Sequence, residues 1–278
     1  MAFKDILIHV DSTPASALRL GLGLTLARRF GARITGLHIV PDPEVPPYFK
    51  PSAVERIAEI YRENAGEAAR LAETNFREAT KNADVVIAWR SISGDLTRLL
   101  AEQARFSDLL LLGQYDTENP PTISAFLLPE KVVVDAGTPI LVVPTRQAFD
   151  DIGQHVLVTW DGSRESARAI HDAIPLLRTA KRVSLLAVDP DRQGHVRSGA
   201  NAAEIVAHLS RHGITTAAME FPSGAENITE VLLAHVAESG ADLLVMGAYG
   251  HPRLVEFMLG GITQNLLGRV SVPVLISH

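Results

Sequence analysis

Cysteine is absent from the 278 residues, aromatic residues make up only 5%, and neither a long apolar run nor a basic block occurs. The lack of cysteine excludes disulfides, thiolate catalysis and cysteine-ligated metals. No apolar run reaches the ~20 residues that a membrane-spanning helix requires. The sequence contains no cluster of five or more basic residues, so binding to nucleic acid or to an anionic membrane is not favoured. The N-terminus MAFKDILIHVD lacks the basic and apolar regions of a secretion signal. We therefore expect a soluble cytoplasmic protein without nucleic-acid or membrane partners.

The chain contains the same unit twice. The stretch Ile6–Ala17 (ILIHVDSTPASA) aligns without a gap with Val156–Ala167 (VLVTWDGSRESA). Further on, Ser107–Asp116 matches Ala241–Gly250, and the closing TPILVVP matches VPVLISH. The last two pairs share one offset of 134 positions (242 − 108 and 273 − 139). An equal spacing of this kind indicates an internal repeat.

Apolar strand-like runs alternate with helical patterns in both copies. Most runs are continuous in Val, Ile and Leu, which is typical of strands buried on both faces of a parallel sheet. We therefore predict an α/β fold with two tandem, doubly wound, five-stranded and mainly parallel sheets. The expected strands are Asp5–Val10, Arg33–Ile39, Asp84–Ile92, Leu109–Leu112, Ile140–Val143, His155–Thr159, Arg182–Val188, Thr215–Glu220, Leu243–Met246 and Val274–Ile276.

Two domains follow from the repeat. Unit one is assigned to residues 1–146 and unit two to residues 147–278, with the polar connector Thr145–Gln154 between them. Unit one carries a longer excursion, in which a proline cluster (Pro41–Pro51) precedes a long amphipathic helix. That excursion is interpreted either as a lid or flap or as a plain surface insertion.

Candidate binding groups in unit two follow the strands at their carboxyl ends, where open α/β sheets bind ligands. They are Asp161, Val188 with Asp189, and the stretch Gly247–Gly250. Gly260 and Gly261 precede the apolar pattern of the last helix, where free N–H groups and the helix dipole favour phosphate. The glycine spacing alone is equally consistent with a turn, a helix and another turn that bind no ligand.

The segment GAYGHPRLVEFMLGG resembles the phosphate loop of the universal stress protein family, whose nucleotide-binding members carry G-x2-G-x9-G followed by Ser or Thr. Gly247, Gly250 and Gly260 fit that spacing. The resemblance extends over both units and implies Rossmann-like domains of the adenine nucleotide alpha hydrolase type. It also implies that Asp161 lies near the ribose or adenine and that the backbone of Val188 meets the adenine edge.

One position departs from the family pattern. Gly261 stands where the family has Ser or Thr, whose hydroxyl reaches the terminal phosphate. Thr263 could supply a hydroxyl from the first helical turn, and His251 could add partial positive charge. The resemblance thus implies an adenine nucleotide (ATP, ADP or AMP), with or without Mg²⁺, and leaves the preferred number of phosphates open.

Unit one has kept the fold and lost this loop. It retains the first glycine as Gly113, but Asp116, Phe126 and Leu127 replace the later glycines, and Pro129 replaces the threonine. A carboxylate repels phosphate, and bulky side chains obstruct the backbone approach. Because unit one dispenses with these glycines, their presence in unit two favours a ligand there.

Other candidates have simpler interpretations. His208 and His212 have the i, i+4 spacing that can chelate a metal, but the sequence places no third ligand, which favours a solvated helix face. Asp11 is interpreted mainly as a helix N-cap. No histidine is placed to activate Ser163 or the neighbouring serine, so no catalytic residue is assigned. Trp160 could stack on adenine, plug the pocket or pack between the units.

Three functions remain open at this point. The leading hypothesis is a stress-response protein that binds an adenine nucleotide in unit two as a signal, with little hydrolysis because Arg253 is the only basic candidate near the loop. The second is a nucleotide-free protein that recruits partners under stress. The third is a slow metal-dependent nucleotidase using Asp189 or Glu256. The resemblance further implies that Ile140–Val143 pairs with Val274–Ile276 in an internal pseudo-twofold dimer, and a homodimer is also considered.

Overall fold

The computed structural model describes residues 2–42, 51–114, 128–187, 202–220, 228–248 and 262–278. Ten strands are found there, close to the ten that were predicted. They are β1 (Asp5–His9), β2 (Arg33–Pro41), β3 (Ile87–Gly94), β4 (Leu109–Gly113), β5 (Ile140–Val143), β6 (His155–Trp160), β7 (Arg182–Ala187), β8 (Thr216–Glu220), β9 (Leu243–Gly247) and β10 (Val274–Ser277). The start of β3 differs most from the prediction, because Asp84 lies in the bend after the preceding helix and accepts a hydrogen bond from Arg28 Nε (2.8 Å).

Helices connect successive strands in both units, as the alternating pattern predicted. They are α1 (Pro14–Phe30), α2 (Pro51–Thr80), α3 (Leu96–Ala104), α4 (Leu128–Ala136), α5 (Arg164–Leu177), α6 (Ala202–Arg211), α7 (Ile228–Ser239) and α9 (Ile262–Arg269). Local signals mark their ends. Pro14 opens α1, Gly31 closes it in the left-handed conformation (φ 62°), and the Asp95 side chain caps α3.

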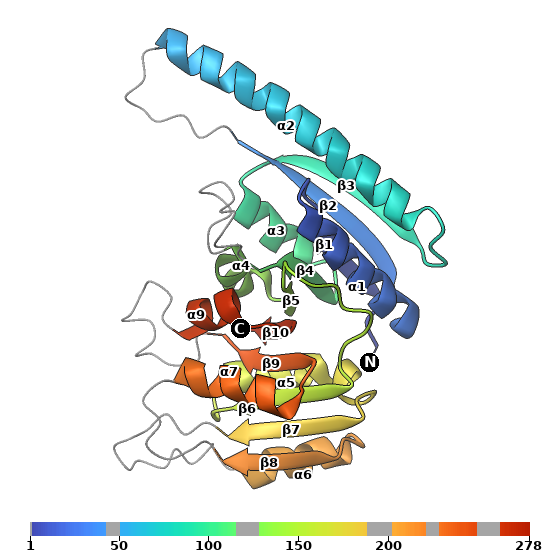
Figure 1. Ribbon diagram of the computed structural model, residues 1–278, viewed down its shortest axis with the longest axis vertical. Coiled ribbons are helices and arrows are strands. Elements are labelled where there is room, and N and C mark those ends of the chain that lie inside the picture. Colours follow the sequence, from blue (N-terminus) through green and yellow to red (C-terminus); the bar gives the residue numbers. More distant parts are fainter. Residues whose placement is uncertain (1, 43–50, 115–127, 188–201, 221–227, 249–261) are drawn as a thin grey trace.

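The strands form one ten-stranded sheet in the order β3-β2-β1-β4-β5-β10-β9-β6-β7-β8 (Figure 1). Every neighbouring pair is parallel except β5 and β10, which run antiparallel with Leu141 opposite Leu275. The expected pairing of these two strands is therefore present, and it joins the two predicted five-stranded sheets into one. Each of these strands gains a partner where its unit alone would have an open edge.

Helices cover both faces of the sheet, which makes the fold doubly wound. One buried core lies under α1, α2, α5 and α6, and a second lies under α3, α4, α7 and α9. Alternate residues of the central strands serve the two cores: Ile6 and Ile8 of β1 belong to the first and Leu7 to the second. The strands are buried on both faces, which explains their continuous apolar sequence.

The aspartate in the repeated D-L-L motif anchors the first strand of each unit. Asp108 Oδ2 accepts hydrogen bonds from the backbone N–H groups of Lys4 (2.7 Å) and Asp5 (3.0 Å). Asp242 accepts in the same way from the N–H groups of Gly153, Gln154 and His155. This part of the repeated motif thus has a structural explanation.

The long helix expected in unit one is α2, which lies over β2 and β3 at one end of the sheet (Figure 1). Its C-terminal part is anchored by Ala72 and Phe76, which are buried in the first core. Across the described residues, no helix has the length and apolar character needed to cross a membrane.

Candidate functional site

The carboxyl ends of β6, β7 and β9 meet at one edge of the sheet. Trp160, the last residue of β6, pairs with Ala187 at the end of β7. On its other side β6 pairs with β9, and Val158 lies opposite Val245, a register that brings Asp161 close to the end of β9. The chain order reverses between β6 and β9, which is where open α/β sheets bind ligands. Asp161 and Gly247, two of the predicted site residues, are therefore brought together.

Asp161 is held in place at the head of α5. Its Oδ1 accepts hydrogen bonds from the backbone N–H of Ser163 (3.0 Å) and from Ser163 Oγ (2.6 Å). Ser163 in turn caps α5, because its Oγ accepts from the N–H of Ser166 (3.1 Å). Among the described residues, the second carboxylate oxygen of Asp161 has no hydrogen-bond partner. The carboxylate is thus oriented through one oxygen.

Gly247 has a packing role that the sequence did not reveal. A Cβ atom placed on it would lie 2.5 Å from the backbone N of Ser166 and 2.6 Å from the carbonyl carbon of Glu165. The first turn of α5 therefore needs a glycine at the end of β9 in order to pack there. This glycine alone does not argue for a phosphate, because the packing of α5 already accounts for it.

Trp160 is buried in the core under α5 and α6. This burial argues against a stacking surface for adenine, which was one of three alternatives. Within the described part of the chain, its indole Nε1 is buried and has no acceptor. A buried N–H donor without an acceptor is unusual, and this one belongs to the residue next to Asp161.

Most of the other predicted site residues lie outside the described residues. This applies to Val188, Gly250, His251, Gly260 and Gly261, and equally to Asp189, Arg253 and Glu256. The backbone of Thr263 is described: it lies in the first turn of α9, which begins at Ile262. The last helix that the sequence predicted after the second glycine pair is therefore present, whereas the glycines themselves lie outside the described residues.

Comparison with known proteins identifies the family. The sequence model of the universal stress protein family matches residues 2–144 and again residues 153–278. The chain belongs to the universal stress protein family. No curated protein sequence matches it.

Solved structures with the same fold include other universal stress proteins. One from Archaeoglobus fulgidus DSM 4304 has a TM-score of 0.65 at 16% identity, with 98% of this chain and 95% of that chain covered. Another, from Pseudomonas aeruginosa UCBPP-PA14, has a TM-score of 0.56 at 16% identity, with 99% of this chain and 93% of that chain covered. A shorter universal stress protein in complex with cAMP has a TM-score of 0.33 at 19% identity, with 52% of this chain and 99% of that chain covered. At these identities the first two likenesses show the fold.

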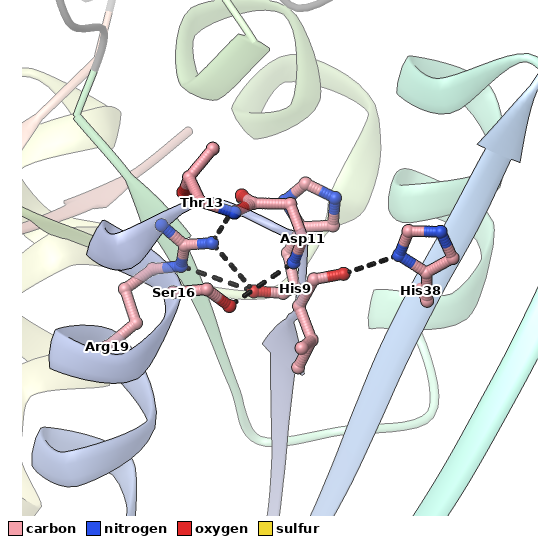
Figure 2. Close-up of polar contacts among 7 residues, drawn as sticks. His9, Asp11, Thr13, Ser16, Arg19 and His38 are labelled. Atoms are coloured by element: carbon pink, nitrogen blue, oxygen red, sulfur yellow. Dashed lines mark hydrogen bonds and ion pairs between the residues drawn. The ribbon is translucent and has the colours of Figure 1, made fainter. Parts of the chain in front are cut away.

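In unit one of this universal stress protein, an arginine engages the aspartate that corresponds to Asp161. Asp11, the counterpart of Asp161, accepts from the backbone N–H of Thr13 (2.8 Å) and from the Thr13 hydroxyl through Oδ1. Its Oδ2 accepts from Arg19 Nη2 at 2.6 Å (Figure 2). Arg19 also donates to the carbonyl oxygen of His9 through Nε (3.2 Å) and Nη2 (3.1 Å). Both oxygens of this carboxylate are therefore satisfied within the chain.

Burial and nearby charges act in opposite directions on the pKa of Asp11. Burial would raise the pKa of Asp11, but the charge of Arg19 and the Thr13 hydrogen bonds outweigh it and lower that pKa to about 2. Burial also lowers the pKa of His9 to about 4, although the Asp11 charge opposes this shift. At neutral pH Asp11 is therefore ionised and His9 is uncharged.

Arg19 is the residue that sequence reasoning missed. Only 2% of it is exposed, and its Nη1 lies 2.5 Å from where a Cβ on Gly113 would be. The guanidinium thus packs against the glycine at the end of β4, beside the carboxylate. The ungapped repeat alignment puts Ala169 at the equivalent position of unit two. The exchange of arginine for alanine between the repeats was the signal that could have revealed the closed site.

A second carboxyl group is buried in unit one, at the start of α4. Glu130 lies in the first turn of α4, only 6% exposed, and its Oε2 has no hydrogen-bond partner among the described residues. Burial raises the pKa of its carboxyl. An anion at this helix N-terminus would meet another acid rather than a free row of N–H donors.

Replacing Glu130 by glutamine is expected to stabilise the protein by about 1–2 kcal/mol at pH 7.5, because a neutral amide costs less to bury than a carboxylate. The pKa of the Glu130 carboxyl is higher in the folded protein than its value of 4.5 in the unfolded chain. The free energy of unfolding of the wild type therefore falls as the pH rises above 4.5. The gain should therefore shrink when urea unfolding is repeated at pH 4.5. Glu67→Gln on the exposed surface of α2 is the control, and an equal effect of both variants would contradict the interpretation.

Proposed function

We propose that this universal stress protein is a cytoplasmic stress-response protein that binds one adenine nucleotide in unit two and uses it as a regulatory signal rather than as a substrate. The observation that carries the proposal is the difference between the two equivalent aspartates. The Arg19 guanidinium donates to the second carboxylate oxygen of Asp11, whereas the second oxygen of Asp161 has no partner among the described residues. Unit two thus retains a recognition group that unit one uses for its own stability.

The surroundings of Asp161 suit a nucleoside. The Asp161 oxygen that has no partner among the described residues can accept hydrogen bonds from ribose hydroxyls or an exocyclic amine, and Asp161 lies at the reversal of strand order. The start of α9 directly after Gly261 supports a phosphate position, because helix N-termini present free N–H groups and a positive dipole.

A nucleotide-free role in recruiting partners is the second candidate. The observation in its favour is the packing of Gly247 against α5, which explains one loop glycine without any ligand. The proposed residues of a slow, Mg²⁺-dependent nucleotidase, Asp189 and Glu256, have no described position, so no described group favours that reaction.

We also propose that the two units form an internal pseudo-twofold dimer. The strand order supports this arrangement because it reads the same from both ends once the units are numbered alike. A side chain of unit one reinforces the junction. Gln114 Nε2 donates to the carbonyl oxygens of Leu267 (2.6 Å) and Val270 (3.0 Å) in unit two.

The test is direct nucleotide binding. Protein purified without added nucleotide is heated, the supernatant is assayed for adenine nucleotides, and ATP, ADP and AMP are titrated by calorimetry. We expect one nucleotide per chain. Gly250→Asp, which introduces the unit-one residue, should weaken binding on the order of 100-fold, because it places a carboxylate where phosphate is proposed to bind. The preferred number of phosphates then tests the role of Thr263.

A matched pair of variants shows which of the two units binds the nucleotide. Asp161→Asn should weaken binding roughly tenfold, because a charged acceptor is lost, while Asp11→Asn at the equivalent position should leave the affinity unchanged. Absence of binding at millimolar nucleotide would replace the proposal with the recruitment role. Turnover that depends on added Mg²⁺ would favour the nucleotidase instead.

A further inference from the structure

A small cavity lies in unit one, at the edge of the sheet opposite to Asp11. It is formed where β1 and β2 begin and α3 ends, and its volume is about 30 Å³. One water molecule needs roughly 10–15 Å³ of such space, so the cavity admits a group about the size of a carboxylate. The polar and aromatic side chains that line it include those of Asp5, Arg33, Thr35, Arg90, Gln103 and Phe106.

The internal repeat shows that two of these side chains are not needed for the fold. In the strand register, Arg90 of β3 corresponds to Met219 of β8. The offset of 134 positions between the repeats places Gly240 where unit one has Phe106 (240 − 106). Unit two therefore forms the same strands and helix with neither the arginine nor the phenylalanine, which favours a role for them in binding.

The two arginines give the cavity an excess of positive charge. Arg33 Nη2 pairs with Asp5 Oδ1 (2.7 Å). Arg90 Nη1 donates to the neutral Gln103 Oε1 (3.0 Å), and no carboxylate among the described residues pairs with Arg90. Two guanidinium groups and one carboxylate leave a net charge of +1 in the lining (2 − 1). The planar guanidinium of Arg90 matches the geometry of a carboxylate, which it can bind through two parallel N–H groups.

Nearby acids limit the negative charge of a ligand. Asp5 lines the cavity, and Asp108 lies close by, where its Oδ2 accepts from the backbone N–H groups of Lys4 (2.7 Å) and Asp5 (3.0 Å). A phosphate dianion would be repelled by these carboxylates twice as strongly as a singly charged anion. The cavity therefore favours a carboxylate over a phosphate.

Phe106 adds an apolar surface beside this charge. It lines the cavity and is 76% exposed, so its ring is available to a ligand. Aromatic rings pack favourably against each other in offset or edge-to-face arrangements. We propose that the cavity binds a small aromatic acid, with its carboxylate on Arg90 and its ring against Phe106. The site is independent of the nucleotide proposed at Asp161, because five strands separate β2 from β6 in the sheet.

The competing explanation is an ordinary surface contact. In that case Arg90 and Gln103 only satisfy each other, and Phe106 only occupies the turn after α3. No ligand would then respond to the charge of Arg90 or to the ring of Phe106. The two explanations differ in what they predict for binding of a model ligand.

The experiment is a benzoate titration of the full-length protein at pH 7.5 and low salt, followed by the NMR chemical shifts of the backbone amides of Thr35 and Ser107. We expect a dissociation constant on the order of 1 mM, as suits a ligand of this size. Acetate lacks the ring, benzamide lacks the charge, and inorganic phosphate carries a second charge. Each of these three should bind at least about tenfold more weakly than benzoate.

Three variants assign the binding to the cavity. Arg90→Met, which introduces the unit-two residue, should weaken benzoate binding roughly tenfold or more because the charged partner is lost. Phe106→Ala should weaken it about fivefold through the lost ring contact. Arg105→Met is the control and should leave binding unchanged, because Arg105 donates to the Asp135 carbonyl oxygen outside the cavity. All three side chains are exposed, so the variants should fold, which far-UV circular dichroism checks.

Each outcome decides the matter. The proposal is overturned if about 20 mM benzoate shifts neither amide, if Arg90→Met binds benzoate as tightly as wild type, or if phosphate binds as tightly as benzoate. Benzoate binding that survives Gly250→Asp supports a site separate from the nucleotide site, whereas its loss in that variant would place benzoate in unit two and overturn the proposal.

Discussion

Arg19→Met should lower the free energy of unfolding by about 4 kcal/mol at pH 7.5, because it leaves the carboxylate of Asp11 without its charged partner in a largely buried position. The same change removes both hydrogen bonds to the carbonyl oxygen of His9. Urea unfolding followed by circular dichroism measures the loss. Nucleotide stoichiometry should stay at one per chain, because Asp116, Phe126 and Leu127 still replace the loop residues of unit two.

A double-mutant cycle isolates the ion pair. Asp11→Asn combined with Arg19→Met should be less destabilised than the sum of the single variants, with a coupling of about 2 kcal/mol. Arg28→Met is the control, since Arg28 meets Asp84 on the exposed surface and should change stability little. If Arg19→Met and Arg28→Met behaved alike, the buried pair would have no special role.

The pair should also show a defined pH dependence. Folding lowers the pKa of Asp11 from 3.8 to about 2, so the unfolded chain binds the proton more readily than the folded protein. The stabilisation is therefore complete above the unfolded pKa and is lost as the pH falls towards 2. Over that window the difference between wild type and Asp11→Asn should shrink, as unfolding at several acidic pH values would show.

Gly247→Ala should destabilise the protein by about 3 kcal/mol. Its Cβ would meet backbone atoms of Glu165 and Ser166, which cannot move without shifting the first turn of α5. Because Asp161 is oriented by Ser163 at the head of that helix, we expect nucleotide affinity to fall as well. Unfolding and calorimetry on the same preparation measure both effects.

Two other glycines serve as comparisons. Gly113→Ala, the equivalent change in unit one, meets the end of the Arg19 side chain, which can move, and should cost about half as much. Gly21→Ala lies in α1 with open space around it and should stabilise by up to about 1 kcal/mol. A Gly247→Ala variant as stable as wild type would show that α5 tolerates the extra atom, and the ligand would again be the better explanation for this glycine.

The features that followed from the sequence depend on local or repeated patterns. Continuous apolar runs predicted the strands, because strands buried on both faces lack polar alternation. The common offset between the repeats predicted equivalent partners, and the family resemblance added the pairing of Ile140–Val143 with Val274–Ile276, which the structure has. The start of α9 after Gly261 followed from the helical pattern.

The features that were missed depend on contacts between distant elements. Neither Arg19 nor His171 belongs to a motif. Arg19 meets Asp11 only when α1 packs on the sheet, and His171 meets His208 only when α5 and α6 lie side by side. Gly247 looked like a loop residue until the backbone of α5 was placed beside it. Trp160 looked available for stacking until its burial was known.

The sequence alone determined the fold class, the two repeats, the order of their elements and the family, because periodicity and spacing can be read along one chain. Only the tertiary structure decided that Arg19 pairs with Asp11, whereas no described residue donates to the second oxygen of Asp161, and that the rings of His171, His208 and His212 lie together on unit two. These outcomes depend on strand register and on how each helix packs against the sheet, and side chains far apart in sequence come within hydrogen-bond distance only in the folded chain.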